Sequence, residues 1–258
     1  MSKAFISEQV EWIHHWNDRL FSFRTSRDPG FRFRNGHFVM VGMEIEGKPL
    51  MRAYSIVSAN HEEHLEFFSI KVPKGALTGR LKNLNVGDRV FLSRKPVGTL
   101  VLDDLRCGER LFLFATGTGL APFLSIVKDP ETYERFESVH VVHGVRNISD
   151  LAYREHLQVE LPRHPYLGDM ISRQLHYLPR VSRESFRPRG RSTDLIENGE
   201  LANAYDLAPL DPVTDKAMIC GSPEMLSDMR SILDQRGFQA SPQQGVPGDY
   251  VFERAFVS

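Results

Sequence analysis

Short apolar segments rich in β-branched and aromatic residues follow one another through the first hundred residues. They lie at 37–45, 51–58, 65–72 and 88–94, and turn residues bound each of them. No convincing long helical period interrupts the series. This pattern predicts a small antiparallel β-barrel domain over residues 1–101.

The hydrophobic period changes from about residue 106. Apolar strands are predicted at 111–115, 139–145, 175–182, 216–221 and 250–257, and helices at 121–136, 150–161 and 223–237. In the last helix, apolar residues recur at helical spacing, Ser222 suits the cap, Pro223 the first turn and Gly237 the end. Alternating strands and helices predict an α/β domain with a parallel sheet over residues 102–258.

Composition narrows the function classes. The 258 residues include 32 basic and 33 acidic side chains, a balance that does not suggest nucleic-acid binding. Two cysteines, Cys107 and Cys220, are too few for a disulfide framework or a four-cysteine metal or iron–sulfur site. With no secretory leader pattern at the start, a reducing cytoplasm is expected.

The longest uncharged run, 111–127, is too short and too interrupted for a membrane span, so no membrane association is expected. Thr116, Gly117, Thr118 and Gly119 divide it into a strand and a helix start. Strand, glycine turn and helix are typical of a nucleotide-binding crossover, although such a turn is often only a turn. Pro122 stands where the usual dinucleotide fingerprint has its third glycine.

Two segments of the first domain also carry candidate chemistry. Strand alternation places Arg52, Tyr54 and Ile56 on one face, which offers a guanidinium for phosphate and a ring for stacking. Further on, Gly75 and Gly79 bracket three residues whose amides and hydroxyl suit a phosphate. An ordinary barrel strand and a surface loop explain these segments equally well when each is taken alone.

Together, the motifs resemble a known family. Arg52-x-Tyr54-Ser55, Gly75-x-x-Thr78, Gly117-Thr118-Gly119-x-Ala121-Pro122 and Cys220-Gly221-x-Pro223 occur in the order and spacing of the ferredoxin–NADP reductase superfamily. The ending Phe-Glu-Arg-Ala-Phe-Val-Ser is similar to that of the bacterial ferredoxin/flavodoxin–NADP reductases. The resemblance covers nearly the whole chain.

The resemblance implies an FAD enzyme in which NADPH passes a hydride to flavin N5 and single electrons then reach ferredoxin or flavodoxin. It places Tyr54, Ser55, Cys220 and Ala255 at the reacting centre, with Cys220 near the nicotinamide rather than acting as a nucleophile. The residues it implies for FAD are Arg52, Ala53, Tyr54, Ser55, Phe68, Ile70, Lys71, Ala76, Leu77, Thr78, Ala255 and Phe256. Those it implies for the nicotinamide nucleotide are Thr116, Gly117, Thr118, Gly119, Cys220 and Gly221. No metal is implied.

An arginine-rich stretch bears on the choice of nucleotide. Nine arginines and no lysine lie between 146 and 191. Arg146, Ser182 and Arg183 follow predicted strands, whose carboxyl ends bind ligands in doubly wound sheets. Arginine pairs bidentately with phosphate, and the family pattern places Arg146, Arg183 and Arg191 around the 2′-phosphate of NADP. A solvated basic loop is the alternative.

Partners and rival functions follow from the same features. A basic run of Arg19, Arg24, Arg27, Arg32 and Arg34 is an ordinary solvated face or a docking surface for an acidic ferredoxin or flavodoxin. Trp12 and Trp16 share one face if this region is helical. A monomer is expected. The alternatives are the reductase component of an oxygenase system and a non-catalytic flavin-binding electron-transfer subunit.

Overall fold

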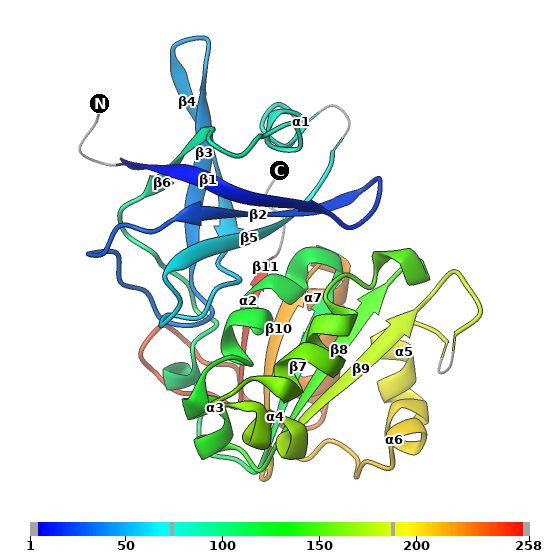
Figure 1. Cartoon of the computed structure of the whole chain (residues 1–258). Coiled ribbons are helices and arrows are strands. Elements are labelled where there is room, and N and C mark those ends of the chain that lie inside the picture. Colours follow the sequence, from blue (N-terminus) through cyan, green and yellow to red (C-terminus); the bar gives the residue numbers. More distant parts are fainter. Residues whose placement is uncertain (1–4, 73–74, 187–188, 255–258) are drawn as a thin grey trace.

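The first part of the chain is a six-stranded antiparallel barrel, seen in blue and cyan in Figure 1. The computed structural model describes residues 5–72, 75–186 and 189–254. The strands run in the order β4-β3-β6-β1-β2-β5, and a bridge between Ile56 and Phe67 joins the two edges. Their bounds are β1 (Phe5–His15), β2 (Leu20–Ser26), β3 (Phe38–Ile45), β4 (Lys48–Ser55), β5 (His64–Ile70) and β6 (Arg89–Ser93). The predicted barrel is confirmed.

The second part is a five-stranded parallel sheet with helices on both faces (Figure 1). Its order is β11-β10-β7-β8-β9, from β7 (Arg110–Thr116), β8 (Ser138–Val145), β9 (Leu175–Val181), β10 (Asp215–Gly221) and β11 (Tyr250–Arg254). One face carries α2 (Ala121–Ile126), α3 (Pro130–Arg135) and α4 (Gly168–Gln174). The other carries α5 (Ser192–Glu197), α6 (Glu200–Tyr205) and α7 (Pro223–Gln235). The predicted α/β domain is also confirmed.

Local signals located some elements well. Helix α7 starts where predicted, with the Ser222 side chain accepting a hydrogen bond from the Met225 amide and Pro223 in the first turn. The predicted helix over 121–136 is instead two helices. Pro130 starts α3, and the Asp129 carboxylate caps it by accepting from the Glu131 amide. A proline cannot continue the preceding helix, so α2 ends before it.

Two predicted helical features are wrong. Trp12 lies in strand β1, and Trp16 follows it directly, so the two do not share a helical face. The predicted helix over 150–161 is a 3₁₀ turn, Ile148–Asp150, followed by a π-helical turn, His156–Glu160. Tyr153 between them has a φ of 61°, a left-handed conformation that no α-helix accommodates.

Strands β2 and β5 are buried on both faces because two domains use them. Phe21, Phe23 and Phe67 point into the barrel core. Leu20 and Phe68 point the other way and join the hydrophobic cluster under α2. The carboxyl ends of the parallel strands are thereby held against one wall of the barrel.

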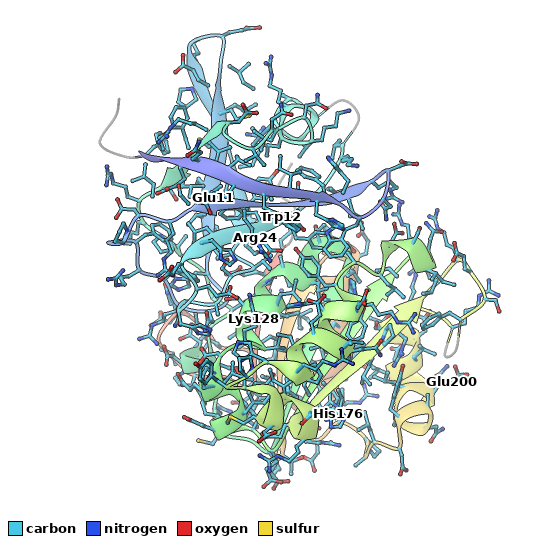
Figure 2. The ribbon with its side chains drawn as sticks, viewed as in Figure 1. Glu11, Trp12, Arg24, Lys128, His176 and Glu200 are labelled. Carbon is cyan, nitrogen blue, oxygen red and sulfur yellow. The ribbon has the colours of Figure 1, made fainter. Side chains whose placement is uncertain are left out.

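Polar contacts complete this domain boundary. The Ser125 hydroxyl of α2 contacts Asn35 Oδ1 at 3.0 Å and the Ser58 carbonyl oxygen at 2.7 Å. Lys128, which Figure 2 shows where the sheet domain meets the barrel, pairs with Glu62 at 2.7 Å. No helix of the described residues is long and apolar enough to cross a membrane.

Two buried histidines make the fold sensitive to acid. Burial lowers the pKa of His140 to about 3 and that of His143 to about 4. The His140 ring is stacked between Phe112 and His176, at centroid distances of 4.8 and 4.9 Å. Both rings are neutral in the fold, whereas an unfolded chain takes up their protons near pH 6.5.

We predict that stability falls as the pH drops from 6.5 toward 4, by up to about 1.4 kcal/mol per pH unit for each of these histidines. The variant His140→Phe keeps the aromatic stack and removes one of the two groups. Its free energy of unfolding, measured by urea titration between pH 4.5 and 7, should therefore fall less steeply than that of the wild type. Parallel curves for the two proteins would contradict this account.

Candidate functional site

A cavity of about 560 Å³ opens where the carboxyl ends of the parallel strands meet the barrel. Residues after β7, β8, β9 and β10 form most of its wall, and Arg19, Leu20 and Ile70 of the barrel close the remaining side. Ligands of open parallel sheets bind at this end of the strands. The cavity volume is that of a small-molecule or cofactor site.

The turn after β7 lies unusually close to the end of β10. A β-carbon added at Gly119 would lie 2.2 Å from the Cys220 carbonyl oxygen, and one added at Gly221 would lie 2.2 Å from Thr116 Oγ1. The Ser222 amide donates to Thr116 Oγ1 at 3.1 Å. The structure thus brings together the two glycine motifs predicted for the nicotinamide nucleotide. Thr116, Gly117 and Thr118 line the cavity.

A buried histidine that the sequence interpretation missed supports this turn. His143 Nε2 lies 3.1 Å from the Gly117 carbonyl oxygen, and its Nδ1 lies 2.9 Å from the Tyr177 hydroxyl. A carbonyl only accepts, so Nε2 carries the proton and Nδ1 accepts from Tyr177. The low pKa of His143, caused by burial, keeps the ring neutral. The ring therefore holds the backbone of Gly117, whose φ of 54° favours glycine.

The predicted arginines gather where the loops after β8 and β9 and the start of α5 line the same cavity. Arg146, Ser182, Arg183 and Arg191 all line it. The Arg183 amide donates to the Arg146 carbonyl at 2.9 Å, so the loops after β8 and β9 are joined. All three arginine side chains are exposed, so water solvates their guanidinium groups, and these groups are desolvated only when a ligand binds. This end of the cavity suits a phosphate group.

Polar groups beside these arginines were not foreseen. The buried Ser192 hydroxyl, in the first turn of α5, lines the cavity and has no hydrogen-bond partner among the described residues. Glu224 and Asp228 of α7 line the same wall and are exposed. They follow the Cys-Gly-x-Pro motif, but single exposed carboxylates on a helix give no sequence signal of a site.

The residues predicted for the flavin are distributed over the barrel. Tyr54 is 9 % exposed and packs edge-to-face on Phe67, and its hydroxyl accepts a hydrogen bond from Ser69 at 3.4 Å. Its neighbours Arg52 and Ala53 are exposed, and Ser55 is half-buried. Phe68 lies in the domain boundary and Ile70 in the cavity wall. Lys71 Nζ donates to the Asn17 carbonyl at 2.7 Å. Stacking of Tyr54 on a flavin stays a prediction.

The Gly75–Thr78 loop shows one notable feature. Leu77 is buried in the barrel core, and Ala76 is exposed. Thr78 Oγ1 is buried without a hydrogen-bond partner among the described residues, and a β-carbon at Gly75 would lie 2.2 Å from it. The Thr78 hydroxyl thus occupies the space that glycine leaves at position 75, and a bound phosphate would supply the acceptor that this buried hydroxyl lacks.

Comparisons with known proteins place these features in a family. Residues 8–101 match the oxidoreductase FAD-binding domain, and residues 113–231 match the oxidoreductase NAD-binding domain. The ferredoxin–NADP reductase of Pseudomonas aeruginosa is 57 % identical over 251 residues, which cover 97 % of each chain. That of Azotobacter vinelandii is 55 % identical with the same coverage. The chain belongs to the ferredoxin–NADP reductase family.

A solved structure agrees with this assignment. The ferredoxin NADP+ reductase of Neisseria gonorrhoeae, crystallised with bound FAD and NADP, superposes with a TM-score of 0.89 at 28 % identity and covers 99 % of this chain and 100 % of its own. The family predicted from the four motifs is confirmed, as is the order of a flavin domain before a nicotinamide-nucleotide domain.

The residues present fit the two nucleotides of this reductase family. The Ser192 and Thr78 hydroxyls are buried and have no partner among the described residues; Thr78 lies in a loop predicted to hold phosphate, and Ser192 directly follows the predicted Arg191. Both are positions where a bound phosphate would supply the missing acceptor. No cluster of three or more metal-ligating side chains occurs in the described ranges.

The end of β10 that lies against the glycine turn is buried. Cys220 is 1 % exposed, and burial raises the pKa of its thiol. Its neighbour on β11, Glu253, accepts from the Thr99 amide and hydroxyl, and burial raises the pKa of that carboxyl as well. Glu253 was not among the predicted site residues. Ala255 and Phe256 lie outside the described residues.

We predict that Gly119→Ala disrupts this site. The added methyl group meets the backbone carbonyl of Cys220, which cannot rotate away, so stability should fall by about 1–3 kcal/mol. The matched control is Gly79→Ala, where no atom lies within 4 Å and alanine favours the helix. Chemical denaturation measures both, and a Gly119→Ala variant as stable as its control would contradict the close approach.

Proposed function

We propose that this chain is an FAD-dependent ferredoxin/flavodoxin–NADP(+) oxidoreductase. FAD, when bound, supplies hydride exchange with NADPH at N5 and one-electron exchange with the protein partner. The observation that carries the proposal is the single cavity with a phosphate-binding end, a glycine turn and a wall from the flavin domain. Its residues would hold the nicotinamide nucleotide beside the flavin domain, and positioning of this kind is the contribution a protein makes to such chemistry.

Different residues along the cavity bind different parts of the nicotinamide nucleotide. Arg183 and Arg191 pair with the 2′-phosphate, Arg146 supports them, and the Ser182 and Ser192 hydroxyls contribute hydrogen bonds. At the other end, Thr116 to Gly119 hold the nicotinamide nucleotide against the wall that contains Ile70. Cys220 stays a neutral thiol there and takes no nucleophilic part.

For FAD, the proposed contacts come from the barrel. Arg52 to Ser55 with Phe68, Ile70 and Lys71 bind the flavin half, and Ala76 to Thr78 hold the pyrophosphate. Ala255 and Phe256 belong to the same proposal through the family resemblance. The Thr78 hydroxyl, which has no partner among the described residues and fits only beside a glycine at 75, supports the pyrophosphate end of this proposal.

The partner surface of the proposal is the basic run near the N-terminus. Arg24 pairs with Glu66, and Arg27 donates to the carbonyls of Phe31, Asn60 and Glu62, so both organise the barrel. Arg19, Arg32 and Arg34 are exposed, although Arg34 also pairs with Asp103 and Arg19 borders the cavity, and we assign these three to the attraction of an acidic ferredoxin or flavodoxin. A monomer acting in the cytoplasm completes the proposal.

The rival functions differ in what the cavity must do. A non-catalytic flavin-binding subunit has no use for an arginine cluster that shares a cavity with a glycine turn. An oxygenase reductase component shares the scaffold but passes electrons to a different partner. Steady-state oxidation of NADPH with a dye acceptor, followed by reduction of purified ferredoxin and flavodoxin, distinguishes the three functions. A protein that oxidises no NADPH would overturn the proposal.

We predict a preference for NADPH over NADH that depends on two arginines. Each charged hydrogen bond to the 2′-phosphate contributes about 1.5–3 kcal/mol, which corresponds to roughly tenfold or more in affinity. Arg183→Ala and Arg191→Ala should therefore raise the KM for NADPH at least about tenfold and leave NADH oxidation nearly unchanged. The control Arg173→Ala, an exposed arginine on α4, should change neither. Equal losses with both nucleotides would indicate a general defect.

We also predict a yellow protein with one non-covalent FAD whose affinity depends on Thr78. The isosteric change Thr78→Val removes the unpartnered hydroxyl, so FAD affinity should fall about tenfold while the FAD-free protein keeps its stability. Thr132→Val is the control, because its hydroxyl donates to the Ile126 carbonyl at 2.7 Å within the second domain. That variant should lose stability and keep FAD. Unchanged FAD affinity in Thr78→Val, measured by flavin fluorescence, would exclude the loop as the pyrophosphate site.

A further inference from the structure

Tyr153 belongs to the second domain in sequence but is buried against the barrel. It follows the turn after β8, and its ring lies 4.5 Å from that of Trp16 and 5.2 Å from that of Phe68. The residue is 5 % exposed. Its φ of 61° is strained for a residue with a β-carbon, and such a conformation persists only where the surroundings enforce it.

The Tyr153 hydroxyl stands in the middle of a directed chain of hydrogen bonds. It donates to Glu66 Oε1 at 2.6 Å and lies 2.5 Å from Ser22 Oγ. Because the Tyr153 hydroxyl donates its one proton to the Glu66 carboxylate, Ser22 is the donor in the contact between Ser22 and Tyr153. Ser22 in turn accepts from Trp16 Nε1 at 2.9 Å. Every donor in the chain therefore has one acceptor, and such chains strengthen one another.

The acceptor at the end of this chain is held in place from the barrel side. Glu66 is 3 % exposed, and its second oxygen accepts from Arg24 Nε at 2.8 Å. The Glu66 amide donates to Ser58 Oγ at 2.7 Å. Glu66 is thus held through its carboxylate by Arg24 of β2 and through its backbone by Ser58, and it offers Tyr153 a fixed anchor across the domain boundary.

The segments that Tyr153 joins, one in the second domain and one in the barrel, both lie next to the cavity. The segment that ends at Tyr153 begins with Arg146 and includes Asp150, and both line the cavity. Asn17 Nδ2 donates to the Ser149 carbonyl at 2.7 Å and ties the same segment to the barrel. On the barrel strands, Ser22 is two residues from Leu20, and Phe68 is two residues from Ile70, the residues that form the opposite wall.

We propose that Tyr153 is a positioning residue that sets the distance between the two halves of the cavity, and so the approach of the nicotinamide to the flavin. It touches neither nucleotide. The hydroxyl connects the loop carrying Arg146 and Asp150 to the strands carrying Leu20 and Ile70. This inference rests on the proposed function, because it concerns the alignment of the two nucleotides of that reaction.

The test is Tyr153→Phe in the FAD-loaded protein. The ring and its contacts remain, whereas the bonds to Glu66 and Ser22 are lost. We expect the rate of flavin reduction by NADPH in stopped flow to fall at least about fivefold. The affinity for 2′-phospho-AMP, which occupies only the arginine end, should stay within about twofold of the wild type. Together these results separate alignment from nucleotide binding.

Tyr133→Phe is the matched control. Tyr133 is also buried, and its hydroxyl donates to the Val127 carbonyl at 2.6 Å, but wholly within the second domain. It should lose stability, as Tyr153→Phe does, without slowing flavin reduction. Equal slowing in both variants, or normal flavin reduction in Tyr153→Phe, would overturn the inference.

A second variant tests the same contact independently, in case Tyr153→Phe fails to fold. Glu66→Gln keeps an acceptor for Tyr153 but removes its charge, so flavin reduction should slow less than in Tyr153→Phe. The effects of the two changes should not add in the double variant, because both act on one bond. Full additivity would contradict the proposed contact. A wild type that oxidises no NADPH would instead contradict the proposed function, so the two failures are distinguishable.

Discussion

The site depends on the close approach of two parallel strands at their carboxyl ends. Gly119 and Gly221 leave room for the turn after β7 to lie against the end of β10, with only backbone and Thr116 Oγ1 between them. A side chain at either glycine would separate the strands and close the floor of the cavity. The position of Cys220 against the glycine turn follows from that contact.

A second constraint is that β2 and β5 serve two hydrophobic cores at once. Their apolar side chains alternate between the barrel interior and the domain boundary, so neither domain can rotate without exposing apolar surface. Within this boundary, polar contacts such as Ser125 to Asn35 and Tyr153 to Glu66 specify one arrangement among the many that apolar packing alone would allow.

Charge is segregated along the cavity. Exposed arginines stand at the end that is expected to receive phosphate, whereas the groups buried behind the glycine turn have pKa values shifted toward their neutral forms. Burial lowers the pKa of His143 and raises the pKa of Cys220 and of Glu253. The same burial makes the protein sensitive to acid through its histidines.

The sequence by itself determined the two architectures, their order and the motif residues. Strand alternation, helical spacing and glycine turns act over a few residues, so they leave a readable local pattern, and Ser222, Gly119 and the arginines of 146–191 were found in this way.

Only the tertiary structure decided which of these residues share a cavity. It also revealed Tyr153, Glu66 and His143, and it replaced the predicted helix at 150–161 with turns. The partners of Tyr153 lie 131 and 87 residues away. Contacts between positions so distant leave no period in the sequence, because they are set by how the domains pack and not by local conformation.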